Sequence, residues 1–309
     1  MRKATRRRLL VWLGQIILVA ILIGSVGRSV VLNWSELRTL DISFQFKPIW
    51  IILSALLVWG SYGILIEAWR RILLGWDQRL GYTPAARIWC LSNLGRYLPG
   101  KVWSVAGLAV LAQRTGVAGW AAAASALVMQ AVAIGTGALV VSFGAPGAAS
   151  PLALLAACCV AGGVIVGLVW KPLAARLVHL AKPGTEFRSL PLTTALLGTA
   201  VTLVSWVAYG IAFWALSNGL FEVSSLSIIQ ATGIFAAGYI VGLLALFAPG
   251  GVGVRELVYV ALLTPMVGGG GALGLSIASR LLLTATEVSA ALVALFLDRR
   301  KESSVDRPV

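Results

Sequence analysis

Histidine and cysteine are almost absent from this sequence, which has one histidine, His179, and three cysteines, Cys90, Cys158 and Cys159. A single histidine excludes a histidine-rich metal site, and we expect no Ser-His-Asp triad. Adjacent Cys158 and Cys159 are poor partners for an ordinary disulfide, and no CxxC spacing of a metal site occurs. We therefore expect no bound metal, no cofactor and no catalytic residue.

Charged residues are also scarce, and most are basic. They make up 12% of the 309 residues, against about 25% in soluble domains, whereas 59% of the chain is hydrophobic. These values predict a polytopic all-α membrane protein. The formal net charge is +14, but the basic residues are scattered between long apolar runs and form no patch. We therefore expect no nucleic-acid partner and attribute the basic residues to membrane topology.

Six apolar segments are long enough for a helix of roughly 20 residues that crosses a bilayer. They are Leu9–Leu32, Pro48–Ile66, Val117–Phe143, Pro151–Trp170, Pro191–Leu216 and Leu273–Leu297. Because the first one is too long for the core of a cleaved signal peptide, we interpret it as a signal anchor. Tryptophans at the segment ends, such as Trp69, are interpreted as interfacial anchors. The small residues of Ala121–Ala126 and Gly135–Gly137 predict close helix packing.

Two further apolar segments are interrupted by a Pro-Gly pair: Leu91–Trp103 (LSNLGRYLPGKVW) and Ala248–Glu256 (APGGVGVRE). Proline removes a backbone donor and glycine adds freedom, so one helix should end and another begin there. Broken backbone at membrane depth is tolerated where it is buried in protein or lines a wet cavity. We predict two re-entrant hairpins, Ala85–Gln113 and Ser225–Phe247 with Val252–Leu263, although a single Pro-Gly pair can also be a simple kink.

The distribution of basic residues favours this topology. With both hairpins entering and leaving on one side, 18 of the 25 Lys and Arg lie inside, including those of the loop Lys171–Leu190. Only Arg38 and Lys47 lie in outer loops. One hairpin then enters from the cytoplasm and the other from outside, a pattern typical of inverted repeats around a central site.

The two breaks also predict a binding site. A helix that begins after each break directs unpaired amides and its positive end at the cavity, which suits an anion, and guanidinium groups suit phosphate. The glycine pattern matches no nucleotide-binding loop. The predicted substrate-binding residues are Asn93, Arg96, Tyr97, Pro99, Gly100, Lys101, Pro249, Gly250, Gly251, Gly253, Arg255 and Glu256.

Two charged residues of the last span have alternative roles. Arg280 and Glu287 are two helical turns apart and share a face. They are candidates for gating, or for buried ion pairs that fix the packing, either Glu256 with Arg280 or Arg255 with Glu287. A third alternative is that a glutamate titrates and couples transport to protons.

The motifs EAWRRILL, SNLGRYLPGKVW and APGGVGVREL, followed by a last span with Arg280, resemble the lysylphosphatidylglycerol synthase transmembrane-region family. This family includes the flippase half of bacterial multiple-peptide-resistance proteins. The resemblance implies an inner-membrane protein that moves a lipid or lipid-linked substrate between leaflets. Because no aminoacyltransferase domain follows the last span, lysyl transfer is not carried over.

We therefore expect a single flippase-like transmembrane domain at 1–297 and a short cytoplasmic tail at 298–309, with both termini cytoplasmic. The expected function is flipping or scrambling of an anionic phospholipid or a prenyl-phosphate-linked substrate. The alternative is a non-transporting partner that presents a lipid-linked substrate to a glycosyltransferase or another lipid-modifying enzyme. An intramembrane enzyme acting on a lipid phosphate is a third hypothesis, for which only Glu256, Glu287 and Tyr97 are available.

Overall fold

The computed structural model describes residues 45–97, 102–148, 150–170, 189–221, 226–245 and 248–305. These residues form eight α-helices and two short 3₁₀ segments, as the sequence predicts. The predicted signal anchor at 9–32 and the basic residues at 171–188 lie outside the described residues.

Five described helices are long and apolar enough to cross a membrane, so the chain is a polytopic membrane protein. They are α3 (Pro48–Leu74), α6 (Gly119–Gly144), α7 (Pro151–Val169), α9 (Leu192–Leu220) and the Val254–Phe296 part of α11 (Val254–Val305). Helix α3 continues past the predicted end at Ile66 and includes the sequence EAWRRILL, which ends at Leu74. Helix α11 likewise extends into the predicted tail.

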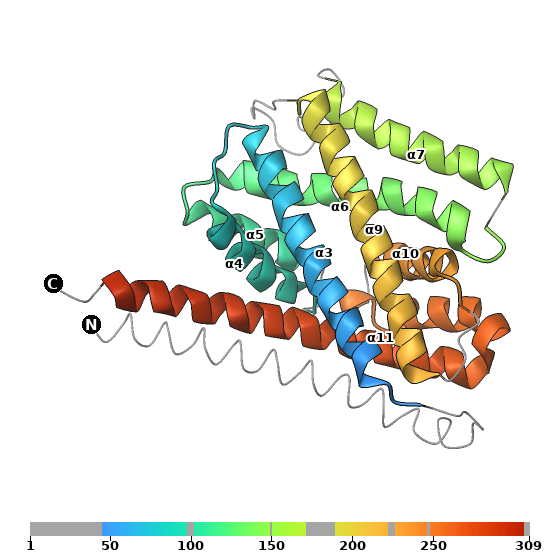
Figure 1. The fold of residues 1–309 in the computed structure, drawn as a ribbon. Helices are drawn as coiled ribbons and strands as arrows, with labels where there is room; N and C mark the ends of the chain where they lie inside the picture. The colour runs from blue at the N-terminus through green and yellow to red at the C-terminus, as the bar shows by residue number, and fades with distance from the viewer. Residues whose placement is uncertain are drawn as a thin grey trace.

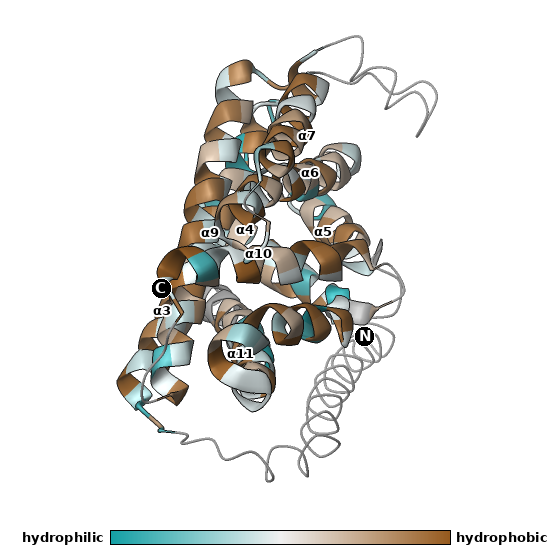
Figure 2. Cartoon of the chain, turned by 90° about the vertical axis from the view of Figure 1, so that its right-hand side faces the viewer, coloured by the Kyte–Doolittle hydropathy of each residue, from teal (hydrophilic) through white to brown (hydrophobic). Residues whose placement is uncertain are grey.

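The long helices pack with their apolar surface on the outside as well as inside. Helices α3 and α9 lie side by side, α6 crosses behind them with α7 packed next to it, and α11 runs beneath (Figure 1). Figure 2 shows apolar residues on the outer faces of these helices. On α7, for example, Leu152 and Leu155 are 76% and 61% exposed. Such exposed apolar surface is what a helix in contact with lipid requires.

Local sequence explains where several helices begin. Proline occupies the first turn of α3 and α7, where no intrahelical bond is lost. The Ser150 hydroxyl accepts from the Ala153 amide at the start of α7. Ser227 and Gln230 form a capping box at the start of α10 (Ile228–Leu244).

Both predicted breaks lie between separate helices. The first separates α4 (Tyr82–Asn93) and the 3₁₀ segment η1 (Leu94–Tyr97) from α5 (Val102–Gln113). The second separates α10 from α11, with the 3₁₀ segment η2 (Pro249–Gly251) between them. Segment η1 contacts η2, so the two breaks meet inside the protein. Gly268, with φ 73° and ψ 164°, then kinks α11.

Each break has its own hydrophobic core. One core joins α4, α5 and the first half of α6 to the end of α3, around Trp69 and Trp76. The other joins α9, α10 and α11, around Phe213 and Tyr259. Tyr62 packs against both cores. The breaks are therefore held by two packed bodies, which contact each other between α3 and α9 and between α6 and α10 as well as at η1 and η2.

The interpretation of Trp69 as an interfacial anchor is wrong. Trp69 is fully buried, and its indole N–H donates to Ser125 Oγ at 2.7 Å. Trp206 is buried in the same way and donates to Thr136 Oγ1 at 3.0 Å. A buried indole needs such a partner, and small hydroxyl residues of α6 supply it. These tryptophans connect helices to one another.

Small residues allow the predicted close packing of α6. An added Cβ at Gly135 would lie 3.1 Å from Ala161 Cα on α7. The closest approach is at the end of α6, where an added Cβ at Gly233 of α10 would lie 2.6 Å from Gly144 Cα. Backbone therefore packs directly against backbone at this crossing.

We expect Gly233→Ala to destabilise the protein by about 1–3 kcal/mol, because the new methyl group must separate α6 from α10. Gly163→Ala is the matched control, since an added Cβ at this exposed α7 position meets nothing within 4 Å. The measurement is the free energy of unfolding by titration with SDS in mixed micelles. Equal stability of the two variants would show that the crossing tolerates a wider spacing.

Candidate functional site

The contact between the two breaks consists of Tyr97 from η1, Gly250 from η2 and Arg280 from α11. Gly250 has φ 58°, and an added Cβ there would lie 3.2 Å from the Tyr97 ring and 3.3 Å from Arg280 Nη2. Only glycine fits this conformation and this space without strain. Gly251 and Gly253 also have positive φ. The predicted residues Pro99, Gly100 and Lys101 lie outside the described residues.

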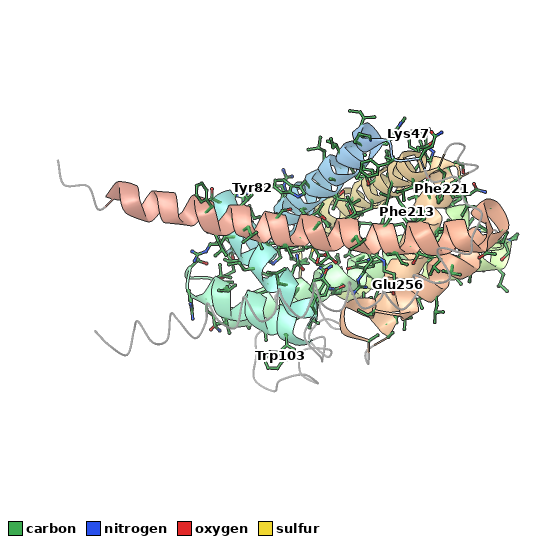
Figure 3. All side chains as sticks on the ribbon, turned by 90° about the horizontal axis from the view of Figure 1, so that it is seen from below. Lys47, Tyr82, Trp103, Phe213, Phe221 and Glu256 are labelled. Carbon is green, nitrogen blue, oxygen red and sulfur yellow. The ribbon has the colours of Figure 1, made fainter. Side chains whose placement is uncertain are left out.

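Glu256 and Arg280 form one of the ion pairs that the sequence predicts. Arg280 Nη1 lies 3.1 Å from Glu256 Oε1 and donates to the Gly250 carbonyl at 3.2 Å. The Gly253 amide donates to Glu256 Oε2 at 2.7 Å. Figure 3 shows Glu256 beside the long part of α11. This carboxylate therefore caps the start of α11 and fixes η2 against the last span.

Glu287 forms a different pair from the predicted one. Its Oε1 accepts from Arg96 Nη1 at 2.9 Å, and its Oε2 accepts from the Tyr97 hydroxyl at 2.6 Å. Asn93 Oδ1 accepts from Arg96 Nη2 at 2.8 Å. The expected pairing of Glu287 with Arg255 is wrong, because η1 places Arg96 next to this face of α11. The Arg96–Glu287 pair thus attaches η1 to α11, whereas the Arg280–Glu256 pair links two parts of α11 and η2 is held by the hydrogen bond from Arg280 to the Gly250 carbonyl.

Arg255 pairs with no carboxylate of the described residues. Its Nε donates to the Tyr259 hydroxyl at 2.8 Å, and its guanidinium lies over the rings of Phe235 and Tyr259, at 4.8 and 5.2 Å from their centroids. Its Nη2 is buried and makes no hydrogen bond to any described residue. A buried unpartnered donor costs about 1–3 kcal/mol, and more when it is charged. The site therefore lacks one acceptor.

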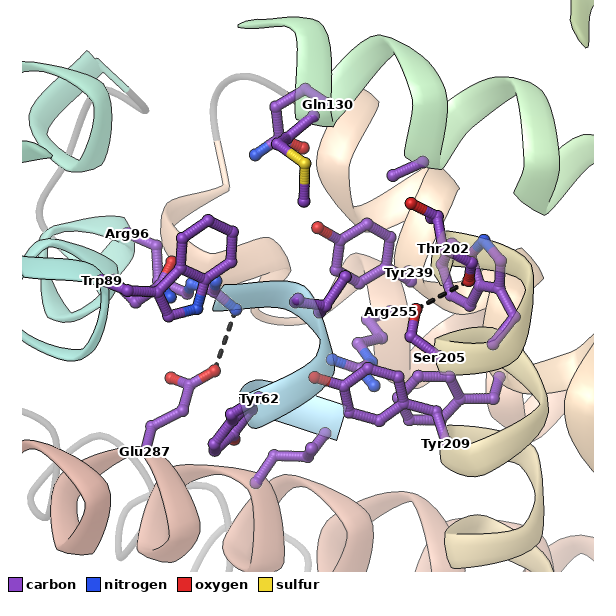
Figure 4. Close-up of a pocket in the computed structure, with 17 residues that line it drawn as sticks. Tyr62, Trp89, Arg96, Gln130, Thr202, Ser205, Tyr209, Tyr239, Arg255 and Glu287 are labelled. Carbon is purple, nitrogen blue, oxygen red and sulfur yellow. Dashed lines mark hydrogen bonds and ion pairs between the residues drawn. The ribbon is translucent and has the colours of Figure 1, made fainter. Parts of the chain in front are cut away.

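A cavity of about 100 Å³ lies beside Arg255, between the two packed bodies (Figure 4). This volume exceeds the roughly 10–15 Å³ that one water needs. The described lining residues come from α3, α4, η1, α6, α9, α10 and α11. They are Tyr62, Leu65, Trp89, Asn93, Arg96, Met129, Gln130, Ala133, Thr202, Ser205, Trp206, Tyr209, Phe235, Tyr239, Arg255, Leu283 and Glu287.

The cavity is positively charged. Its described lining contains two arginines, Arg96 and Arg255, and one carboxylate, Glu287, so the balance is one positive charge. The Arg96 side chain remains 33% exposed although it is paired with Glu287, which is only 9% exposed. A cationic cavity in a low-dielectric interior favours an anion of single charge.

The structure brings four of the predicted residues to this cavity: Asn93, Arg96, Arg255 and Glu287. Among the other described ones, Tyr97, Gly250, Glu256 and Arg280 make the contact between the breaks. Sequence reasoning missed Gln130, Tyr209 and Tyr239, which stand on the long helices α6, α9 and α10. The sequence offered one signal for Gln130, which is that a polar amide side chain occurs within the otherwise apolar sequence of α6.

Two comparisons with known proteins bear on this geometry. The family model described as lysylphosphatidylglycerol synthase TM region matches residues 12–289. This range includes both breaks, the cavity and both arginine–glutamate pairs. No curated protein matches the chain.

Proposed function

The chain belongs to the lysylphosphatidylglycerol synthase TM region family, and from this premise we propose that it translocates an anionic lipid or lipid-linked substrate between membrane leaflets. The observation that carries the proposal is the contact of two broken helical segments beside a cationic cavity. Ligand sites of transporters are built from such discontinuous helices near the bilayer centre.

The topology is part of the proposal. Six full spans, including 9–32, would surround two re-entrant hairpins that enter from opposite sides as an inverted repeat. Both termini would be cytoplasmic, and the membrane would be a bacterial-type inner membrane, because this arrangement keeps most basic residues inside. The meeting of η1 and η2 supports it, since hairpins that enter from opposite sides meet at their tips near the bilayer centre.

Arg255 would bind the phosphate of the substrate, because it has the unpartnered donor and is fixed by two aromatic rings. Arg96 would add a second contact when the phosphate competes with Glu287 for its guanidinium. Lys101 and the backbone of Pro99, Gly100 and Pro249–Gly251 would complete the site at the breaks. The acyl or prenyl chains would remain in the bilayer, because the cavity is too small for them.

Glu256, Arg280 and Glu287 would control the opening between the hairpins. Arg280 holds the Gly250 carbonyl of η2 and pairs with Glu256 at the start of α11, and the Arg96–Glu287 pair fixes η1 to α11. Exchange of Glu287 for a substrate phosphate at Arg96 would release η1 from α11. Binding and opening would then be coupled through one side chain.

The test is leaflet exchange of fluorescent anionic lipids in proteoliposomes that contain the purified full chain. We expect faster exchange than in protein-free vesicles of the same lipid composition. Exchange at the protein-free rate for every phospholipid and prenyl phosphate tested would contradict translocation. It would favour the alternative of a partner that presents a lipid-linked substrate to a glycosyltransferase, which co-purification of that enzyme would then test.

A further inference from the structure

The cavity contains two polar side chains whose hydrogen-bonding capacity is unused, and their chemistry restricts the ligand. Within the part of the chain that the structure describes, the buried side-chain atoms without a partner are Gln130 Oε1, Arg255 Nη2 and Ser276 Oγ. Gln130 and Arg255 both line the cavity, and Ser276 does not. One is a neutral acceptor and the other a charged donor. A ligand that satisfies both must offer a hydrogen-bond donor and an anionic acceptor.

We infer that the cavity binds a phosphodiester with an uncharged polyhydroxyl head group, such as glycerol or a sugar. This inference rests on the proposed function and names the substrate class of the same site. The phosphodiester would accept from Arg255, and a hydroxyl of the head group would donate to Gln130. A phosphodiester carries one negative charge, which balances the single positive charge of the described lining.

Further hydroxyl groups in the wall suit such a head group. The hydroxyls of Tyr209 and Tyr239 line the cavity and make no hydrogen bond to another described residue (Figure 4). Each can both donate and accept. Ser205 and Thr202 donate to helix carbonyls, so their oxygens remain free to accept. These groups match hydroxyls, which also donate and accept.

The walls of the cavity are aromatic. Six of the lining side chains are aromatic: Tyr62, Trp89, Trp206, Tyr209, Phe235 and Tyr239. Aromatic faces pack against the C–H groups of a polyol while tyrosine and tryptophan edges contact its hydroxyls. Pockets with apolar walls and a few placed polar groups are typical of specific small-ligand sites.

An ammonium head group fits this cavity less well. Its natural partner would be Glu287, but both oxygens of that carboxylate already accept hydrogen bonds, from Arg96 and Tyr97. The net positive charge of the described lining also repels the ammonium group of such a ligand. The aromatic face of Phe235 is already covered by Arg255.

Binding of short-chain lipids to the detergent-purified full chain tests the inference, measured as the shift of the thermal unfolding midpoint with ligand concentration. The probes are dioctanoyl phosphatidylglycerol, a farnesyl phosphoryl hexose, dioctanoyl phosphatidylmethanol and dioctanoyl phosphatidylethanolamine. Phosphatidylmethanol is the critical control because it is a phosphodiester of the same charge whose head group has no hydroxyl.

We expect at least one of the two polyol ligands to bind about threefold to tenfold more tightly than phosphatidylmethanol, the effect of one or two hydrogen bonds. The tighter of the two polyols identifies the source, a glycerophospholipid or a prenyl-linked sugar. Equal affinity of phosphatidylmethanol and both polyols, or tightest binding of phosphatidylethanolamine, would overturn the inference.

A pair of matched variants locates the selectivity. Gln130→Met removes the unpartnered acceptor at similar volume, and we expect it to bind the polyols no more tightly than phosphatidylmethanol. Gln113→Met makes the same change at an exposed position of α5 and should retain wild-type selectivity. Selective binding without leaflet exchange would support the head-group class and contradict translocation. Leaflet exchange without head-group selectivity would support translocation and contradict the head-group class.

Discussion

Replacing Arg255 by methionine is expected to slow lipid exchange in proteoliposomes at least about 30-fold. Removal of one member of a buried charged contact reduces the binding free energy by about 2–5 kcal/mol. A loss of about 2 kcal/mol corresponds to a roughly 30-fold effect. Methionine keeps an unbranched apolar stem and removes the guanidinium that lies over the rings of Phe235 and Tyr259. We expect the variant to fold, because it removes a buried Nη2 donor that has no partner among the described residues, at the loss of the single hydrogen bond from Nε to Tyr259.

Two controls separate the loss of the site from a general loss of charge. Arg71→Met makes the same change on α3, where the Arg71 side chain is 49% exposed and pairs with Glu67, and it should exchange lipid at the wild-type rate. Arg255→Lys keeps the charge without the planar fork and should be intermediate. Wild-type exchange by a folded Arg255→Met protein would contradict the assignment of the phosphate site.

Glu287→Met is expected to destabilise the protein by about 3–5 kcal/mol, because it leaves the guanidinium of Arg96 without its carboxylate. Glu287 is 9% exposed and also accepts from Tyr97, so little water can replace it. The measurement is again the free energy of unfolding in SDS titration. Glu67→Met is the matched control, since its pairs with Arg70 and Arg71 are solvent-accessible and should contribute about 1 kcal/mol or less.

The double variant Arg96→Met with Glu287→Met distinguishes pairing from packing. If the loss in Glu287→Met comes from the unpaired charge, removal of Arg96 as well should restore most of the stability. If the two losses simply add, Glu287 stabilises α11 through contacts other than Arg96. The same double variant removes the proposed coupling between phosphate binding and release of η1. It should therefore be stable but defective in exchange.

The helices of this protein could be predicted from its sequence because each one depends on local properties. The spans that begin at Pro48, Val117, Pro151 and Pro191 agree with α3, α6, α7 and α9 to within a few residues, except that α3 is longer at its end. Apolar composition alone determines whether a segment of this length enters a bilayer. The two breaks were predictable for the same reason, since proline and glycine act on the backbone where they stand.

Charge pairing was only partly predictable. The predicted pair of Glu256 with Arg280 is present. Glu287, however, pairs with Arg96, which is 191 residues away in the sequence, and not with Arg255. The spacing of Arg280 and Glu287 indicates that they share a face of a helix, and it contains no information about what packs there. The burial of Trp69 escaped prediction in the same way, because its position beside charged residues is also typical of an interface.

The sequence by itself determined the class of the protein, the positions of its helices and breaks, and the family to which it belongs. The tertiary structure alone decided that the two breaks touch, that Arg255 Nη2 has no partner among the described residues, and that Gln130, Tyr209 and Tyr239 line the same cavity. The physical reason is that helix formation follows from neighbouring residues and the surrounding solvent. A cavity is the space left between helices that are distant in the sequence, so its walls follow from packing.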